Sequence, residues 1–563
     1  MTDRLRRTFR ASWSTAAGVA APRWLEMLVV LVTFCVAGSG PAEAPNEPPR
    51  SARPLTVMVP MRDGVKLSTV IFVPPGDAPR PAILHRTPYG KSRSGTRYVR
   101  AGYAYVSQDQ RGRGGSQGVY QPHESEIEDG YDTVEWVASQ TWCNGKVGMT
   151  GTSAPGIAAN LAAAAAPPHL TAAFVRVAPH SLFYEGRFIG GVFKEADTGN
   201  WMRRQGVSEE AITAYKKRVV LDERWKRTDL VFHRHQIRIP IYNAGGWYDL
   251  FCLGNVSNFQ FLQERGHADA RGKQRLMMGP VGHGRLRGDL AYPSARPESD
   301  EEVRFFDHWL RGADNGVSRE PPVKYYMMAA ARRGSPSAKN GWRTAQTWPP
   351  KASHPARFYL TQGLGITRVK PTSGSGSTGY TFDPQNPVPT KGGLNLTLPL
   401  GPIDQREIGQ RLDYLRFQSE PLKRDLVVAG KIDLRLWAAT DGPDTDFMVK
   451  LVDVYPDGYE ALVLDTALRT RYRFGRRSED VKMMVPNQPE EMTIDMWHTA
   501  ITFEQGHRLA VHIASSNSPR FEVNPNTGEA PGGDHLSPRA AINTIFHNAE
   551  RPTSLVMSVL SSQ

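Results

Sequence analysis

A serine with small neighbours lies between two apolar stretches early in the chain. Gly151 lies two residues before Ser153, and Gly156 lies three residues after it. Residues 146–150 are typical of a buried strand, and residues 157–166 are typical of an alanine-rich helix. A serine on such a tight strand-to-helix turn can present its hydroxyl as a nucleophile, and the glycines let strand and helix approach closely. Pro155 departs from the G-x-S-x-G pattern, although proline is accepted in the first turn of a helix. The alternative interpretation is an ordinary tight turn.

Two later residues are candidates for the acid and the base that a nucleophilic serine needs. Asp249 follows a predicted strand at 239–244, and His283 follows another at 275–279. A serine hydroxyl is unreactive at its ordinary pKa, and a histidine oriented by a carboxylate can take its proton. Taken singly, Asp249 could cap a helix and His283 could be a surface histidine. Their order along the chain after Ser153 predicts a Ser-His-Asp triad.

Such a triad also needs donors for the negative charge that develops on a substrate oxygen. The backbone N–H of Ala154, at the start of the predicted helix, is one candidate. The loop after the predicted strand at 81–85 lacks an HGGG-type motif but holds Tyr89, whose hydroxyl could donate instead; the alternative is a packed aromatic residue. Trp247 and Tyr248 are predicted as walls of the substrate pocket. This chemistry requires no metal and no organic cofactor.

The elements that must position these residues fall into three zones. Residues 55–180 and 237–348 alternate apolar runs with helical segments, which predicts an α/β domain with a parallel sheet covered on both faces. Residues 181–236 are charged, with apolar residues at helical intervals, and predict an inserted helical cap. Residues 349–563 show short alternating strands separated by turns, which predicts an all-β sandwich.

The ends, charge and cysteines limit the class of protein. Residues 1–44 combine basic residues, a short apolar run and an A-x-A site, which predicts a signal peptide, followed by a Pro-rich linker at 45–54. We expect export to the periplasm or the medium by a Sec or twin-arginine route, without stable membrane insertion after processing.

The basic residues that give the net charge of +13 are scattered along the chain, which disfavours nucleic acid as a partner. Cys143 and Cys252 are predicted to be free and buried; homo-oligomerisation stays open.

Several longer stretches carry a resemblance to a known family. The chain resembles the CocE/NonD, or cocaine-esterase-like, branch of the X-Pro dipeptidyl-peptidase S15 family in His85–Lys91, Gln108–Gly118, Trp142–Ser153, Gly245–Asp249, Arg304–Gly312, Asp441–Gly458 and Gly506–Gly528. The resemblance implies an α/β-hydrolase domain, a helical cap and a C-terminal jelly-roll-like sandwich. It also implies Ser153, Asp249 and His283 as triad, with Tyr89 and Ala154 as hole donors.

Two departures and one acidic loop qualify what the resemblance implies. Relatives commonly have an aromatic residue where this chain has Ala154, which alters the pocket wall, and the cap is short for the family. The acidic loop that begins at Asp441 could suggest a metal site, but its recurrence in this family favours a structural turn.

Several functions remain compatible with these residues. The leading hypothesis is a serine hydrolase that cleaves carboxylic esters or amides of small molecules through an acyl-enzyme. Alternatives are an α-amino-acid ester hydrolase, a glutaryl-type acylase or an X-Pro dipeptidyl-peptidase. The last would need carboxylates for the substrate ammonium, and Glu195 and Asp197 in the cap are candidates. From another class, the sandwich could bind polysaccharide beside a relict hydrolase domain.

Overall fold

The structure, a computed structural model, describes residues 54–297, 300–532 and 537–561. The predicted signal peptide and the linker up to residue 53 lie outside the described residues. The described residues group into one compact unit that contains two large sheets.

The first sheet has ten strands in the order β1-β2-β4-β3-β5-β6-β9-β10-β11-β12. The neighbouring pairs from β4 to β11 are parallel, whereas β1, β2 and β12 run antiparallel to their neighbours. The strands are β1 (Leu55–Pro60), β2 (Lys66–Phe72), β3 (Arg80–Thr87), β4 (Ala104–Asp109), β5 (Cys143–Thr152), β6 (Leu170–Arg176), β9 (Ile241–Tyr248), β10 (Arg275–Gly282), β11 (Val323–Met327) and β12 (Gly341–Ala345).

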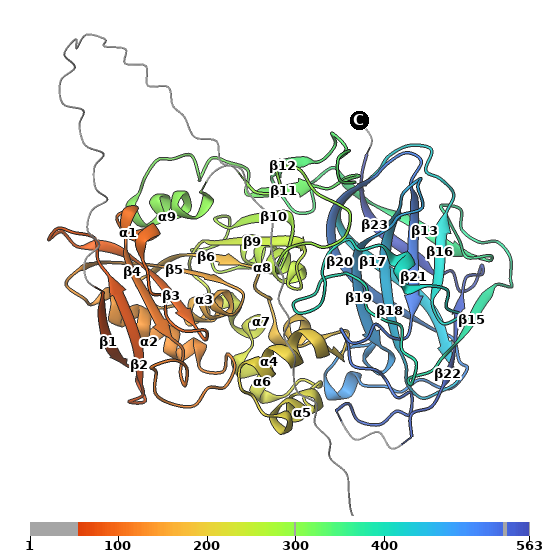
Figure 1. The fold of residues 1–563 in the computed structure, drawn as a ribbon, viewed down its shortest axis with the longest axis horizontal. Helices are drawn as coiled ribbons and strands as arrows, with labels where there is room; N and C mark the ends of the chain where they lie inside the picture. Colours follow the sequence, from red (N-terminus) through yellow and green to blue (C-terminus); the bar gives the residue numbers. More distant parts are fainter. Residues whose placement is uncertain (1–53, 298–299, 533–536, 562–563) are drawn as a thin grey trace, which may run out of the picture. The chain divides into compact units, whose positions relative to one another are not determined.

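Helices cover both faces of this sheet, as the alternation of strands and helices predicts. Ala82 and Leu84 of β3 pack with helices α2 and α3 in one apolar cluster, whereas Ile83 between them joins Phe305 and Phe306 of helix α9 in another. Figure 1 shows α2 and α9 on opposite sides of the sheet. The helices of this domain are α1 (Thr96–Arg100), α2 (Glu126–Ala138), α3 (Ala154–Ala164), α8 (Cys252–Arg265) and α9 (Glu301–Arg311).

The predicted cap is inserted between β6 and β9 and contains short helices and one hairpin. Ser208, Asp222 and Asp229 accept backbone N–H bonds at the starts of α5, α6 and α7, which explains where these helices begin. The cap elements are η1 (Leu182–Gly186), β7 (Phe188–Ile189), β8 (Val192–Phe193), η2 (Glu195–Gly199), α4 (Asn200–Arg204), α5 (Glu209–Lys217), α6 (Glu223–Thr228), α7 (Leu230–His233) and η3 (Arg234–Gln236).

The hairpin β7–β8 is a feature that the helical interpretation of the cap missed. Its turn consists of Gly190 and Gly191, both with positive φ (54° and 82°). A Cβ atom on Gly191 would lie 2.1 Å from the ring of Tyr472 in the 3-10 turn that follows β19 (Glu460–Arg469), and Arg469 N donates to Gly190 O at 2.9 Å. Glycine is therefore required both by the turn and by the contact.

The second sheet contains the eleven remaining strands and forms the β-sandwich. β17 pairs with β20 as well as with β22 and β23, so the sheet turns back over its own apolar core. Its strands are β13 (Ser353–Thr361), β14 (Gly365–Thr367), β15 (Ser377–Phe382), β16 (Leu415–Ser419), β17 (Leu426–Thr440), β18 (Asp446–Val454), β19 (Glu460–Arg469), β20 (Glu490–Phe503), β21 (Arg508–Ala514), β22 (Ala541–Phe546) and β23 (Ser554–Leu560), with 3-10 turns η4 (Gln405–Ile408), η5 (Thr470–Tyr472) and η6 (Ser478–Asp480).

The cysteine prediction is confirmed: Cys143 and Cys252 are free and buried. Among the described residues, no helix combines the length and apolar character needed to cross a membrane.

Candidate active site

Ser153 lies on a strained turn between β5 and α3. Its backbone has φ 62° and ψ −125°, a conformation that a residue with a side chain rarely adopts. A Cβ atom on Gly151 would lie 2.2 Å from the carbonyl carbon of Pro155, and one on Gly156 would lie 3.0 Å from Arg176 O. The glycines around the serine are thus needed for the close approach that the sequence predicts.

A chain of hydrogen bonds joins the three residues predicted as a triad. His283 Nε2 lies 2.8 Å from Ser153 Oγ, and His283 Nδ1 lies 2.8 Å from Asp249 Oδ2. With the proton on Nδ1 donated to the carboxylate, Nε2 can accept the proton of the serine hydroxyl. The other oxygen of Asp249 accepts the N–H of Phe251 at 2.8 Å, which orients the carboxylate. The two loops follow β9 and β10, neighbours in the sheet.

The surroundings of His283 favour its protonated form relative to a free histidine. Burial lowers the pKa of His283, but the charge of Asp249 and the hydrogen bond to it raise it, so that the net pKa lies above the ordinary value. Asp249 is fully buried and the His283 side chain is 8% exposed. An imidazolium that forms during reaction is therefore stabilised at this position.

The two predicted hole donors lie in different surroundings. Ala154 occupies the first position of α3, where a backbone N–H has no acceptor within the helix. Tyr89 is 53% exposed, and its hydroxyl accepts a hydrogen bond from Trp201 Nε1 at 2.9 Å. The hydroxyl proton of Tyr89 stays available for donation, but the residue does not line the cavity beside Ser153. Its role as hole donor stays a prediction.

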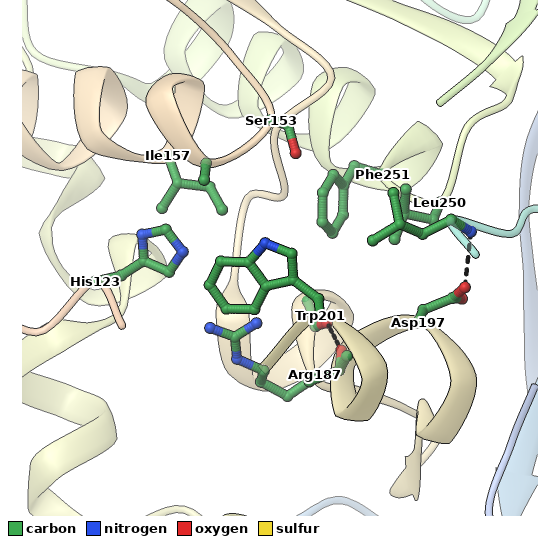
Figure 2. A pocket seen from close by; sticks show the side chains of 12 residues that line it. His123, Ser153, Ile157, Arg187, Asp197, Trp201, Leu250 and Phe251 are labelled. Atoms are coloured by element: carbon green, nitrogen blue, oxygen red, sulfur yellow. Dashed lines mark hydrogen bonds between the residues drawn. The ribbon is translucent and has the colours of Figure 1, made fainter. Parts of the chain in front are cut away.

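A cavity beside Ser153 is lined by all three zones of the chain (Figure 2). The α/β domain contributes Ile157, Leu250 and Phe251, the cap contributes Trp201 among others, and the sandwich contributes Leu396. Phe251 also packs edge-on against His283, with ring centroids 5.6 Å apart. The walls next to the serine are therefore largely apolar.

Trp247 and Tyr248 do not form walls of this cavity, and the prediction for them is wrong. Both are 1% exposed in the core, because β9 continues to Tyr248. Trp247 Nε1 donates to Tyr326 O at 2.8 Å, and the hydroxyls of Tyr248 and Tyr292 lie 2.8 Å apart. The chain turns at Asp249, so the residues that reach the cavity are the next two.

The cap carboxylates are already paired with cations. Asp197 lines the cavity, but one of its oxygens accepts the N–H of Leu396 at 2.7 Å and the other lies 3.9 Å from Arg520 Nε. Glu195 is outside the cavity lining and forms ion pairs with Arg203 and Lys216. The charges of both carboxylates are thus offset by cations, although Asp197 Oδ2 itself accepts no hydrogen bond.

The acidic loop at Asp441 is held by arginines. Asp444 accepts hydrogen bonds from Arg471, and Asp446 pairs with Arg469 at 2.8 Å. Within the described residues, no group of three or more His, Cys, Asp or Glu side chains is arranged to hold a metal ion.

The comparisons with known proteins agree with this arrangement. Residues 63–218 match the X-Pro dipeptidyl-peptidase (S15 family) profile, and residues 315–556 match that of the X-Pro dipeptidyl-peptidase C-terminal non-catalytic domain. Cocaine esterase of Rhodococcus sp. (strain MB1 Bresler) is 30% identical over 580 residues, which cover 90% of this chain and 98% of the relative.

Two solved structures have the same architecture along most of the chain. An α-amino acid ester hydrolase superposes with a TM-score of 0.77 at 25% identity, covering 90% of this chain and 96% of the other. A CocE/NonD family hydrolase from Staphylococcus aureus gives a TM-score of 0.71 at 19% identity, covering 91% and 93%.

The sheet order, the inserted cap and the similar proteins define an α/β-hydrolase, and the protein is a serine hydrolase. More narrowly, the chain belongs to the X-Pro dipeptidyl-peptidase S15 family, in its CocE/NonD branch.

Proposed function

We propose that the protein hydrolyses carboxylic esters, with Ser153 as nucleophile. The observation that carries this proposal is the position of His283, 2.8 Å from both Ser153 Oγ and Asp249 Oδ2. Ser153 Oγ attacks the carbonyl carbon while its proton passes to His283 Nε2. The tetrahedral intermediate collapses to an acyl-enzyme as His283 returns the proton to the leaving alcohol. Water then repeats the sequence and releases the acid.

The negative oxygen of each intermediate needs two donors. In our proposal these are the N–H of Ala154 and the hydroxyl of Tyr89, because helix N-termini and neutral hydroxyls stabilise such charge without moving. Loss of one donor lowers kcat about 100- to 1,000-fold in comparable sites. Tyr89→Phe tests the second donor directly.

An ester fits the cavity better than a peptide with a free N-terminus. An aminopeptidase-type substrate carries an ammonium group that needs an uncompensated carboxylate. Asp197 is the acid in the described lining: one oxygen accepts the N–H of Leu396, and the other has no hydrogen-bond partner but lies 3.9 Å from Arg520 Nε, which offsets its charge. The neighbouring Lys194 is buried as well and adds positive charge to this region.

A fluorophosphonate probe tests the proposal at the level of mechanism. We expect it to label the wild type and the Ser139→Ala control, a surface serine at the end of α2, but not Ser153→Ala. Equal labelling of Ser153→Ala would mean that another residue is the nucleophile, and an unlabelled wild type would favour the polysaccharide-binding alternative. We then expect hydrolysis of p-nitrophenyl butyrate to exceed that of cephalexin and of Gly-Pro-p-nitroanilide.

We further propose that the protein is exported and processed after Ala44. Support comes from the basic start, the short apolar run and the A-x-A site of residues 1–44. Cell fractionation followed by N-terminal sequencing tests this, and the mature chain should begin at Pro45.

A further inference from the structure

A buried arginine without a counter-ion lines the same cavity as Ser153. Arg187 is 5% exposed, and its Nε and Nη2 atoms have no hydrogen-bond partner. Among the described residues, no acidic side chain forms an ion pair with it. Its guanidinium lies over the Trp201 ring, 5.1 Å from the ring centre, and Figure 2 shows Arg187 and His123 both next to this ring.

An unpaired buried cation is costly to the fold. Taking a guanidinium out of water requires an anion and satisfied donors to compensate, and the face of one aromatic ring offsets only part of this cost. Burial accordingly lowers the pKa of Arg187. Its backbone is fixed at the base of the β7–β8 hairpin, where its N–H bonds Leu182 O and its carbonyl accepts the N–H of Lys194. The side chain is therefore held in the cavity although no carboxylate in the described structure forms an ion pair with it; the buried Asp229 acts on its charge only from a distance.

His123 adds a second unsatisfied polar group at the same end of the cavity. It is 2% exposed, its Nδ1 has no partner, and its ring stacks on Trp201 at 5.7 Å. Its backbone has φ 68°, a strained conformation for a residue other than glycine. Burial and the charge of Arg187 keep the pKa of His123 well below the ordinary value, so the ring is neutral and can donate one hydrogen bond without adding charge.

The two nitrogen atoms of Arg187 that lack a hydrogen-bond partner indicate the shape of the ligand that they could bind. Nε and Nη2 lie on one edge of the guanidinium plane, and two parallel N–H bonds from such an edge match the two oxygens of a carboxylate. The acyl part of an ester stays bound to Ser153 after the alcohol has left. In our proposal the acyl chain, rather than the leaving alcohol, occupies the cavity that Ser153 and Arg187 both line.

We propose that Arg187, assisted by His123, binds a carboxylate at the far end of the acyl chain, so that half-esters of short dicarboxylic acids are preferred substrates. This inference rests on the ester hydrolysis proposed above and specifies its substrate class. Arg187 is in this view a specificity-determining residue and takes no part in bond cleavage.

Monomethyl and dimethyl glutarate provide a matched pair, because they share the scissile ester and differ in one negative charge. We expect the wild type to prefer monomethyl glutarate, and Arg187→Met to lower the ratio of the two kcat/KM values by about 30- to 100-fold, the usual effect of losing a charged hydrogen bond. Arg187→Lys should retain part of the preference, since it keeps the charge but loses the paired donors. Hydrolysis is followed by pH-stat titration.

Arg234→Met is the control for loss of an arginine that is half-buried and lacks an ion pair in the described structure. Arg234 also has unpartnered Nε and Nη1 atoms, but it stacks on Phe261 and does not line the cavity. We expect the ratio to be unchanged in this variant. An unchanged ratio in Arg187→Met, or an equal fall for both substrates, would overturn the proposal.

Binding to an inactive variant separates this inference from the proposed function. In Ser153→Ala we expect glutarate to raise the melting temperature, and the added Arg187→Met change should abolish this shift. If glutarate does not stabilise Ser153→Ala, the carboxylate subsite is wrong. If the wild type hydrolyses no ester, the proposed function fails, while this binding experiment still tests Arg187.

Discussion

At the residue scale, the protonation of His283 depends on a balance between burial and the charge of Asp249. Burial alone lowers the pKa of the imidazole, and Asp249 raises it above the ordinary value. Since the neutral imidazole is the base, kcat/KM of the wild type should fall as the pH drops through this raised pKa.

Asp249→Asn should therefore change both the rate and its pH dependence. Without the carboxylate charge, burial is left to lower the pKa of His283, so we expect the acid limb of kcat/KM to move to lower pH. We also expect kcat to fall about 10⁴-fold, because the amide no longer orients the histidine tautomer. A pH–rate profile with p-nitrophenyl butyrate measures both effects. An acid limb at unchanged or higher pH would contradict the assignment of Asp249.

Also at the residue scale, we expect Trp201 to limit the size of the acyl group that the cavity can hold. Its ring lies in the cavity (Figure 2) and its Nε1 donates to Tyr89. Trp201→Ala should enlarge the cavity and raise the ratio of octanoate to acetate hydrolysis about tenfold or more, since each newly buried methylene contributes about 0.8 kcal/mol. Trp201→Phe keeps most of the ring and should leave the ratio within a few-fold of wild type. If both variants shift the ratio equally, the hydrogen bond to Tyr89 rather than ring size controls selectivity.

At the element scale, the junction of β5 and α3 depends on Gly151. A Cβ atom there would lie 2.2 Å from the Pro155 carbonyl carbon, and backbone atoms cannot rotate away as a side chain can. Gly151→Ala should destabilise the fold by about 1–3 kcal/mol and slow fluorophosphonate labelling about 100-fold by displacing Ser153. Gly341→Ala in β12 is the control, because a Cβ atom there meets nothing within 4 Å. Labelling at the wild-type rate in Gly151→Ala would show that the turn tolerates the contact.

The lengths and local sequence patterns of the strands and helices explain which parts of the site could be predicted from the sequence. The strand, turn and helix around Ser153 have strong local patterns, and Asp249 and His283 follow apolar strands of the same sheet. The pattern around Trp247 does not show where β9 ends or which way its last side chains point, so the pocket walls were misplaced. The two-residue strands β7 and β8 are too short to have a periodicity, although the glycine pair at their turn was a usable signal.

At the scale of the whole molecule, the α/β domain and the sandwich share one apolar cluster and one cavity. Trp247 of β9 stacks on Trp348 at 5.3 Å, and Met328 bridges to Ile501 of β20. Leu396 reaches the cavity from the sandwich, and the adjacent Thr397 donates to Ala196 O at 2.6 Å. No local sequence pattern predicts contacts between residues about 200 positions apart, so the sequence did not identify Leu396 as a cavity residue. For the same reason, the predicted domain boundary at 349 does not indicate whether the two domains are stable independently.

A shared core should make the two sheets unfold together. Multidomain proteins commonly melt in separate steps, but unfolding the sandwich here would expose Trp247 and remove Leu396 from the cavity. We therefore expect a single calorimetric transition, with coincident melting of helical circular dichroism, which reports on the α/β domain and cap, and of tryptophan fluorescence. Trp348→Ala should lower both midpoints by the same amount, because its ring packs between Trp247 and Tyr325 at the junction. Two resolved transitions, or a Trp348→Ala shift in one signal only, would show that the domains are energetically independent.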